Sequence, residues 1–228
     1  LCCVKGGLNV CFIHNKVNVF HFILCNCVCP LQLKRFRVRN IFLGVLVLLS
    51  LNGYSATITS KANGNWNSTA TWSTGTVPTS SDNVTISSGN TVKINAAATC
   101  KNLTVTGILY IGNNTTARTL TVNGTLTINS GGIFVANPSF AATHTLTCAG
   151  SITNNGTMNM EPNSTCVCNT TLNPTANITL GGTVPVIFYN LTSTASRNVT
   201  LGNNETIGGT LTISSGRVDV STSNYSLS

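Results

Sequence analysis

A short phrase that recurs along the chain constrains its fold more than any other feature. Three segments share the pattern Leu-Thr-x-x-Gly-x-apolar, namely Leu103–Ile111, Leu120–Ile128 and Leu146–Asn154. Apolar residues alternate with polar ones in each segment, and this period of two indicates a β-strand with one buried face. Thr suits the outward positions because it is β-branched and also polar. Self-similarity of this kind is typical of repeat architectures.

The spacing of the repeated glycine favours a solenoid. Gly107, Gly124, Gly150 and Gly182 follow one another at 17, 26 and 32 residues, and the turns of a parallel β-helix accept insertions between stacked strands. The alternative is a β-sandwich, which would have turns every ~8–12 residues and no recurring phrase. We therefore predict an all-β, right-handed parallel β-helix. We place its glycines at bends, where a positive φ carries no penalty for glycine.

The composition agrees with this fold and argues against one class of partner. Only 7% of the 228 residues are charged, and neutral polar residues suit turns and stacked coils better than long helices. The net charge is +8, but half of the basic residues lie before residue 40 and the later ones are scattered singly. A nucleic-acid surface needs clustered Lys and Arg. We therefore expect no nucleic-acid partner.

Residues 34–55 have the layout of a secretory signal peptide. Four basic residues precede an apolar run, Ile41 to Leu51, and Gly53 and Ser55 are the small residues before a cut at Ala56. The alternative is an uncleaved anchor, but the run is shorter than the ~20 residues that a membrane span requires. We predict export to the extracellular space or the outer cell surface, with no stable membrane insertion after cleavage.

Residues 1–33 do not follow the repeat pattern. They contain six of the ten cysteines, and no Met precedes Met158. Their Cys and His spacing matches none of the usual zinc patterns. We interpret this stretch as non-native, translated upstream sequence.

The most specific segment is Gly64–Ile94. It contains Trp66 and Trp72 and continues with glycine, proline, Asp82 and the alternating Val84-Thr-Ile86. This pattern resembles the opening of the extracellular domain named for its eight glycines, and also the first coils of large secreted β-helix repeat proteins of Bacteroidetes. The resemblance covers roughly residues 56–135. It implies a β-helix, export, and association with surface carbohydrate or matrix, and it transfers no binding residues.

Trp66 and Trp72 are the candidate binding residues, because aromatic rings can stack on sugars. The alternative, which we favour, is that both rings cap the solenoid, since a terminal coil must cover its strand edges and apolar interior. We accordingly divide the exported part into a capping segment at 56–99 and β-helix coils at 100–228. Because residues 210–228 read as a solenoid in mid-pattern, we expect the coils to be truncated at the C-terminus.

Four cysteines lie in the exported part. Cys100 and Cys148 fall at apolar strand positions, where Cys acts as a small hydrophobe. Cys166 and Cys168 share one face of a strand, so a bridge between them would be strained. Because export permits disulfides, we expect one of these two to pair with Cys148 on a neighbouring coil.

Acid–base groups are scarce beyond Ala56. The carboxylates are Asp82, Glu161, Glu205 and Asp219, and the one histidine is His144. β-Helix lyases and glycosidases need paired carboxylates, or an acidic calcium site with a base. We therefore predict a secreted or cell-surface structural, adhesin-like module that is not an enzyme and has no cofactor or metal. Its candidate partners are surface polysaccharide and extracellular matrix. The alternative is a catalytic or non-catalytic part of a β-helix polysaccharide lyase or glycosidase.

Overall fold

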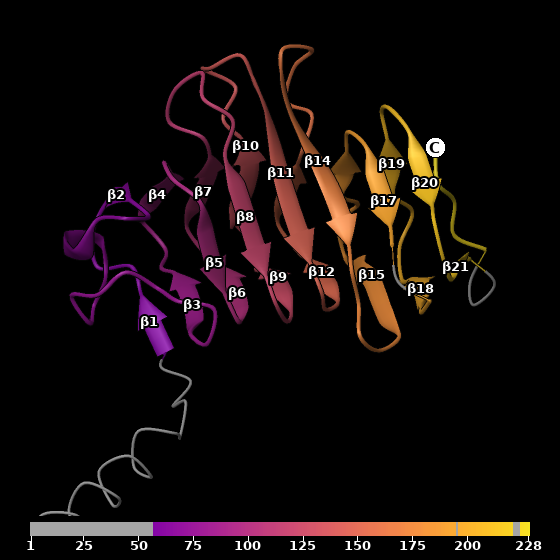
Figure 1. Cartoon of the computed structure of the whole chain (residues 1–228), viewed down its shortest axis with the longest axis horizontal. Coiled ribbons are helices and arrows are strands. Elements are labelled where there is room, and N and C mark those ends of the chain that lie inside the picture. Colours follow the sequence, from indigo (N-terminus) through magenta and orange to yellow (C-terminus); the bar gives the residue numbers. More distant parts are fainter. Residues whose placement is uncertain (1–56, 195, 221–223) are drawn as a thin grey trace, which may run out of the picture. The chain divides into compact units, whose positions relative to one another are not determined.

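The computed structural model describes residues 57–194, 196–220 and 224–228. The predictions for residues 1–33 and for the signal peptide at 34–55 concern residues outside these ranges. The described part contains 21 short strands and one 3-10 helix, η1 (Thr69–Thr71). Figure 1 shows the strands side by side along one axis, with η1 and β2 at the N-terminal end.

The strands form three parallel sheets, and from β3 onward every third strand returns to the same sheet. Sheet 1 contains β1 (Thr57–Thr59), β3 (Asn83–Ile86), β6 (Asn102–Val105), β9 (Leu126–Ile128), β12 (Ile152–Asn154), β15 (Ile178–Gly182), β18 (Asn198–Leu201) and β21 (Arg217–Asp219). Sheet 2 contains β2 (Gly64–Asn65), β4 (Thr91–Ile94), β7 (Ile108–Ile111), β10 (Ile133–Ala136), β13 (Thr157–Asn159), β16 (Ile187–Phe188) and β19 (Thr206–Ile207). Sheet 3 contains β5 (Ala98–Cys100), β8 (Thr119–Val122), β11 (Ala142–Cys148), β14 (Cys166–Leu172), β17 (Leu191–Ser193) and β20 (Leu211–Ile213).

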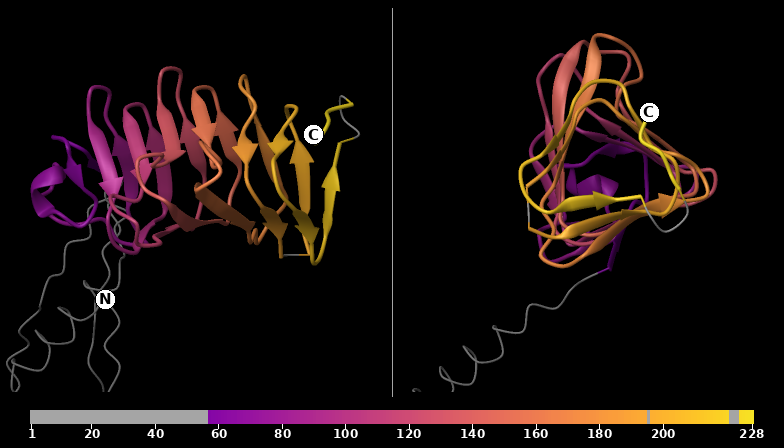
Figure 2. Two further views of the ribbon diagram at one scale, coloured as in Figure 1. Left: turned by 90° about the horizontal axis from the view of Figure 1, so that it is seen from above. Right: turned by 90° about the vertical axis from the view of Figure 1, so that its right-hand side faces the viewer.

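The prediction of a parallel β-helix is confirmed. All the pairings between these strands are parallel, whereas the alternative β-sandwich is built from antiparallel sheets. Viewed along the axis, the three sheets form the sides of a triangle (Figure 2). The core fills the inside of this triangle.

The core consists of apolar columns, because register places equivalent strand positions on top of one another. In sheet 1 one such column contains Val84, Leu103, Leu126, Ile152, Leu180 and Leu201. All six side chains are buried, and each buried aliphatic side chain stabilises the fold by roughly 1.5–3 kcal/mol. The intervening threonines, such as Thr104 and Thr127, point outward and are partly exposed, as the alternation predicts.

Each copy of the repeated phrase spans a corner between two sheets rather than a whole coil. Leu103–Ile111 runs from sheet 1 to sheet 2, whereas Leu120–Ile128 and Leu146–Asn154 run from sheet 3 to sheet 1. The pairs Leu103↔Leu126 and Leu126↔Ile152 set the true coil lengths at 23 and 26 residues. The interval of 17 residues between Gly107 and Gly124 is therefore only part of a coil.

Glycine is required at the repeated positions mainly because neighbouring coils approach each other closely there. A Cβ at Gly107 would lie 2.2 Å from the carbonyl oxygen of Ser87, and one at Gly150 would lie 2.5 Å from that of Gly124. Among the repeated glycines only Gly182 has a positive φ, at 121°. The expectation of positive φ is wrong at the other positions. There a Cβ would meet the preceding coil, at backbone for Gly107 and Gly150 and at the Asn102 side-chain oxygen for Gly124.

The stacked sheets begin before residue 100. Strands β3, β4 and β5 lie between residues 83 and 100, and they pair with β6, β7 and β8. The segment 56–99 therefore contains one coil of the solenoid in addition to the turns around Trp66 and Trp72.

Candidate functional site

Trp66 and Trp72 pack against each other at the N-terminal end of the core. Their ring centroids lie 5.0 Å apart at an interplanar angle of 74°, and the indole N–H of Trp72 donates to the carbonyl oxygen of Trp66 at 2.7 Å. The exposed fractions of the two residues are 1% and 0%. A sugar-stacking platform needs an exposed ring face, and in this structure both rings are buried.

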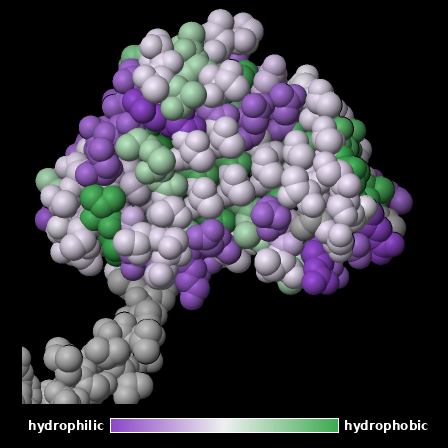
Figure 3. Space-filling model, in the orientation of Figure 1, coloured by the Kyte–Doolittle hydropathy of each residue, from purple (hydrophilic) through white to green (hydrophobic). Residues whose placement is uncertain are grey.

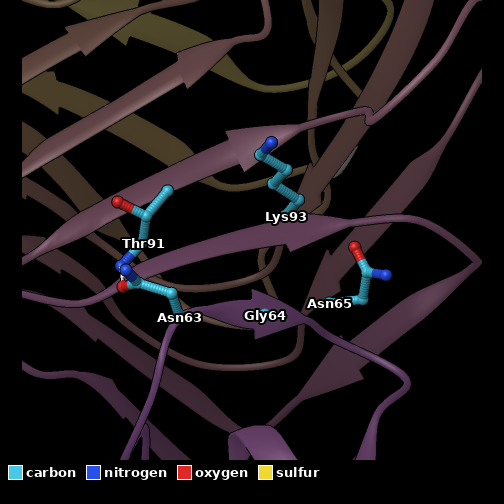
Figure 4. A pocket seen from close by; sticks show the side chains of 5 residues that line it. All are labelled: Asn63, Gly64, Asn65, Thr91 and Lys93. Carbon is cyan, nitrogen blue, oxygen red and sulfur yellow. Dashed lines mark hydrogen bonds between the residues drawn. The ribbon is translucent and has the colours of Figure 1, made fainter.

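A surface pocket of about 340 Å³ lies beside this aromatic pair. It is built on the edge strand β2 and its neighbour β4, where Gly64 lies opposite Val92 and Asn65 opposite Lys93. Figure 4 shows side chains from both strands around the hollow. The lining residues are Asn63, Gly64, Asn65, Thr91 and Lys93.

Hydrogen bonds to the backbone hold the walls of the pocket in place. The side-chain oxygen of Asn63 accepts the Thr91 N–H at 2.6 Å, and the hydroxyl of Thr71 donates to the carbonyl oxygen of Asn65 at 2.8 Å. A Cβ at Gly64 would lie 2.3 Å from that hydroxyl oxygen, so glycine lets η1 pack closely against β2. The pocket is therefore a fixed part of the first coil.

The pocket can bind through hydrogen bonds and one positive charge. Lys93 supplies an exposed ammonium group, Asn65 a side-chain amide and Thr91 a hydroxyl. Amides and hydroxyls both donate and accept hydrogen bonds, which suits sugar hydroxyls, and an ammonium pairs with a carboxylate. The lining contains no carboxylate and no histidine, so it offers no acid–base pair for cleaving a glycosidic bond.

Sequence reasoning did not identify this pocket. The residues that line it come from strands 28 positions apart, and only the pairing of Asn65 with Lys93 brings them together. The one local signal is that Lys93 lies between the apolar residues Val92 and Ile94, an alternation that would place its side chain outward. No sequence signal shows which neighbouring strand supplies the opposite wall.

The carboxylates occupy separate places in the fold. Asp82 accepts the N–H of Thr79 at 2.8 Å and its hydroxyl at 2.7 Å, which orders a turn. Asp219 forms an ion pair with Arg217 at 3.4 Å. The Glu161 carboxylate lies against Gly208, and Glu205 is buried. Among the residues with described positions, no group of three or more His, Cys, Asp or Glu is placed to hold a metal ion.

His144 and Cys168 lie opposite each other in the core, on β11 and β14. The ring nitrogen Nδ1 of His144 accepts the backbone N–H of Arg118 at 3.0 Å. Burial lowers the pKa of His144, with a further contribution from Arg118, and burial raises the pKa of the Cys168 thiol. Both shifts favour the neutral forms, whereas a cysteine nucleophile requires a thiolate. The pair therefore serves packing.

The expected disulfide of Cys148 is wrong. Cys148 lies opposite Leu172, four residues along the strand from Cys168, which lies opposite His144. Cys100, Cys148, Cys166 and Cys168 are all buried and free. Cys100 and Cys148 occupy one inward column on either side of Val122, which confirms their predicted role as small hydrophobes.

Comparison with known families gives one match. The model of the G8 domain matches residues 71–226, which is more than half of the chain. Searches of curated proteins and of solved structures gave no match. Within the described ranges, no helix is both long enough and apolar enough to cross a membrane.

Proposed function

We propose that this chain, which belongs to the G8 domain family, is a secreted or cell-surface structural module of the adhesin type that binds carbohydrate. The single observation that carries the proposal is the polar pocket on β2 and β4, in which Lys93, Asn65 and Thr91 face one hollow. A solenoid suits this role because its stacked coils give a long, regular framework. The pocket adds a place for a ligand at one end.

The pocket chemistry favours an acidic polysaccharide as the ligand. Lys93 would pair with a sugar carboxylate, while the amide of Asn65 and the hydroxyl of Thr91 would exchange hydrogen bonds with neighbouring hydroxyls. The pocket is lined by no aromatic side chain, so ring stacking does not contribute. Because the single charge pair lies at the surface, it adds little affinity and weakens with salt. Strong attachment to a polysaccharide would then depend on many copies of the module binding together.

We propose that the module acts without catalysis. The described carboxylates are dispersed among a turn, an ion pair, a contact with Gly208 and the core. The arrangement required for glycoside hydrolysis is two carboxyl groups at ~5–9.5 Å across one bond, and the pocket supplies neither.

Titration of uronic-acid oligosaccharides against the purified chain tests the proposal. We expect weak binding that Lys93→Ala reduces several-fold and that raising the salt concentration reduces as well. Lys101→Ala removes an exposed lysine outside the pocket and should leave the affinity unchanged. Equal affinities of the two variants, or no binding by the unmodified chain, would refute the pocket as a carbohydrate site.

A further inference from the structure

The outer face of sheet 3 carries a column of threonines in continuous register. Thr lies at the equivalent outward position of β5, β8, β11, β14, β17 and β20. The members are Thr99, Thr121, Thr147, Thr171, Thr192 and Thr212. Neighbouring strands lie ~4.8 Å apart, so hydroxyl and methyl groups repeat at that interval along the solenoid.

A second polar column runs beside the first. Thr119 pairs with Thr145, and Thr145 pairs with Asn169. Beyond Asn169, the side-chain N–H of Asn190 donates to the Asn169 side-chain oxygen at 2.9 Å, and Asn190 in turn accepts the Thr210 N–H at 2.7 Å. The two columns are two residues apart along each strand, or ~6.6 Å. Together they make a two-dimensional grid.

The outward positions of the other two sheets do not carry such a regular threonine column. The equivalent column on sheet 2 contains Lys93, Tyr110, Val135, Asn159 and Ile187. Sheet 1 carries a threonine column too, but it ends after Thr153, which lies opposite Gly181. Only on sheet 3, among the described strands, does threonine occupy the position in every strand of the sheet.

The chemistry of this face indicates which kind of surface it can bind. The outward strand positions of sheet 3 carry no charge and no aromatic ring. In Figure 3 the surface over β8, β11, β14 and β17 is mostly pale, which marks intermediate hydropathy. An uncharged face is complementary to an uncharged surface, and each Thr offers one methyl and one hydroxyl with few rotamers. The ligand should therefore itself be neutral, rigid and periodic.

We propose that the outer face of sheet 3 binds ice. The two grid spacings lie near the oxygen repeats of the hexagonal ice lattice, so water ordered over the hydroxyls and methyls can match that lattice. Each contact is weak, but the array is fixed by a hydrogen-bonded backbone, so little conformational entropy is lost on binding. The free energies of many weak contacts then add up, because all of them are made by one rigid surface.

The test uses the purified chain, slowly growing ice and a thermal-hysteresis measurement. We expect the chain to enter the ice and to lower the freezing point below the melting point. A double substitution at the centre of the grid, Thr147→Lys with Thr171→Lys, should abolish most of both effects, because two long charged side chains prevent a flat contact. Exclusion of the unmodified, folded chain from ice would overturn the proposal.

Two control variants make the result specific. Val135→Lys places one lysine outward on sheet 2, and Thr127→Lys places one in the threonine column of sheet 1. Both should retain hysteresis and ice partition. A loss with Thr127→Lys and none with the sheet 3 variant would overturn the assignment to sheet 3. Oligosaccharide binding through Lys93 should be unchanged in the sheet 3 variant, so the two proposals fail independently.

Discussion

The side-chain carboxyl of Glu205 accepts a hydrogen bond from the backbone N–H of Val186 inside the core. Glu205 occupies an inward position at the end of sheet 2, and its exposed fraction is 1%. Its other carboxyl oxygen has no partner among the described residues. Burial raises the pKa of Glu205 to about 7, although the hydrogen bond from Val186 opposes the shift. A charge is therefore costly at this position.

The buried carboxyl makes stability depend on pH. Below pH 4.5, the ordinary pKa of a Glu side chain in the unfolded chain, both states hold the proton. Between that pH and about 7 the unfolded chain ionises first, so the folded state loses stability as pH rises, by about 3 kcal/mol in total. We expect a higher urea midpoint at pH 5 than at pH 8. Glu205→Gln should remove most of this difference.

Glu161→Gln serves as the control, because it removes a partly exposed carboxyl. It should preserve the difference between pH 5 and pH 8. If Glu205→Gln preserved the difference equally well, the carboxyl would have to be solvated in the native state.

The close contact between Gly150 and Gly124 predicts a second effect. Gly150→Ala places a methyl group against the Gly124 backbone, and overpacking of this kind typically costs about 1–3 kcal/mol. At Gly202 the nearest atom is a Thr179 methyl carbon at 3.2 Å, so Gly202→Ala should cost less. Chemical denaturation of both variants checks the order. A smaller loss at Gly150 would contradict the tight stacking of these corners.

The two tryptophans differ in what they lose on substitution. Trp72→Phe removes the donor to the Trp66 carbonyl, and a buried unpaired acceptor costs about 1–3 kcal/mol. The indole N–H of Trp66 has no partner among the described residues, so Trp66→Phe should be less destabilising. Hydrogen exchange should show faster opening of β1 to β4 in the Trp72 variant and little change beyond β14, because coils contact mainly their neighbours. Equal costs would mean that the hydrogen bond contributes little.

The four described cysteines should resist thiol reagents in the folded chain. Burial raises the pKa of Cys100 to about 12 and that of Cys148 to about 11, and thiolates are the reactive form. Iodoacetamide labelling at pH 8 followed by peptide mapping should modify them only after denaturation. A cross-linked peptide joining Cys148 to Cys166 or Cys168 would contradict the register of β11 and β14.

In the three repeated segments, alternation was sufficient to predict the strands and which side chains point inward. It could not assign a strand to a sheet, because the three sides of the triangle have similar interiors and share the same phrase. Leu103 and Leu120 therefore read as equivalent, although they lie in sheets 1 and 3. Pairing between coils joins residues about 20–30 positions apart, as Leu126 and Ile152 do, and no local signal sets that interval.

The same limit applies to individual residues. Trp66 and Trp72 suggested a binding surface because aromatic rings serve both binding and packing, and only the fold of the first coil shows that they are buried. The Lys93 pocket depends on the pairing of β2 with β4. The burial of Glu205 depends on the inward position that register gives it beyond Val186. The burial of the tryptophans, the Lys93 pocket and the burial of Glu205 all depend on pairing between residues far apart in the sequence.

The parallel stacking also determines how the molecule responds to force. Hydrogen bonds between coils run along the solenoid axis, because the strands that they join lie across it. Tension along the axis therefore passes through all the inter-coil seams in series, so the weakest seam opens first and the others follow one by one. A load across the axis is shared by strands in all three sheets and shears many bonds together. A tether made from this fold would lengthen gradually when stretched end to end and remain stiff against bending.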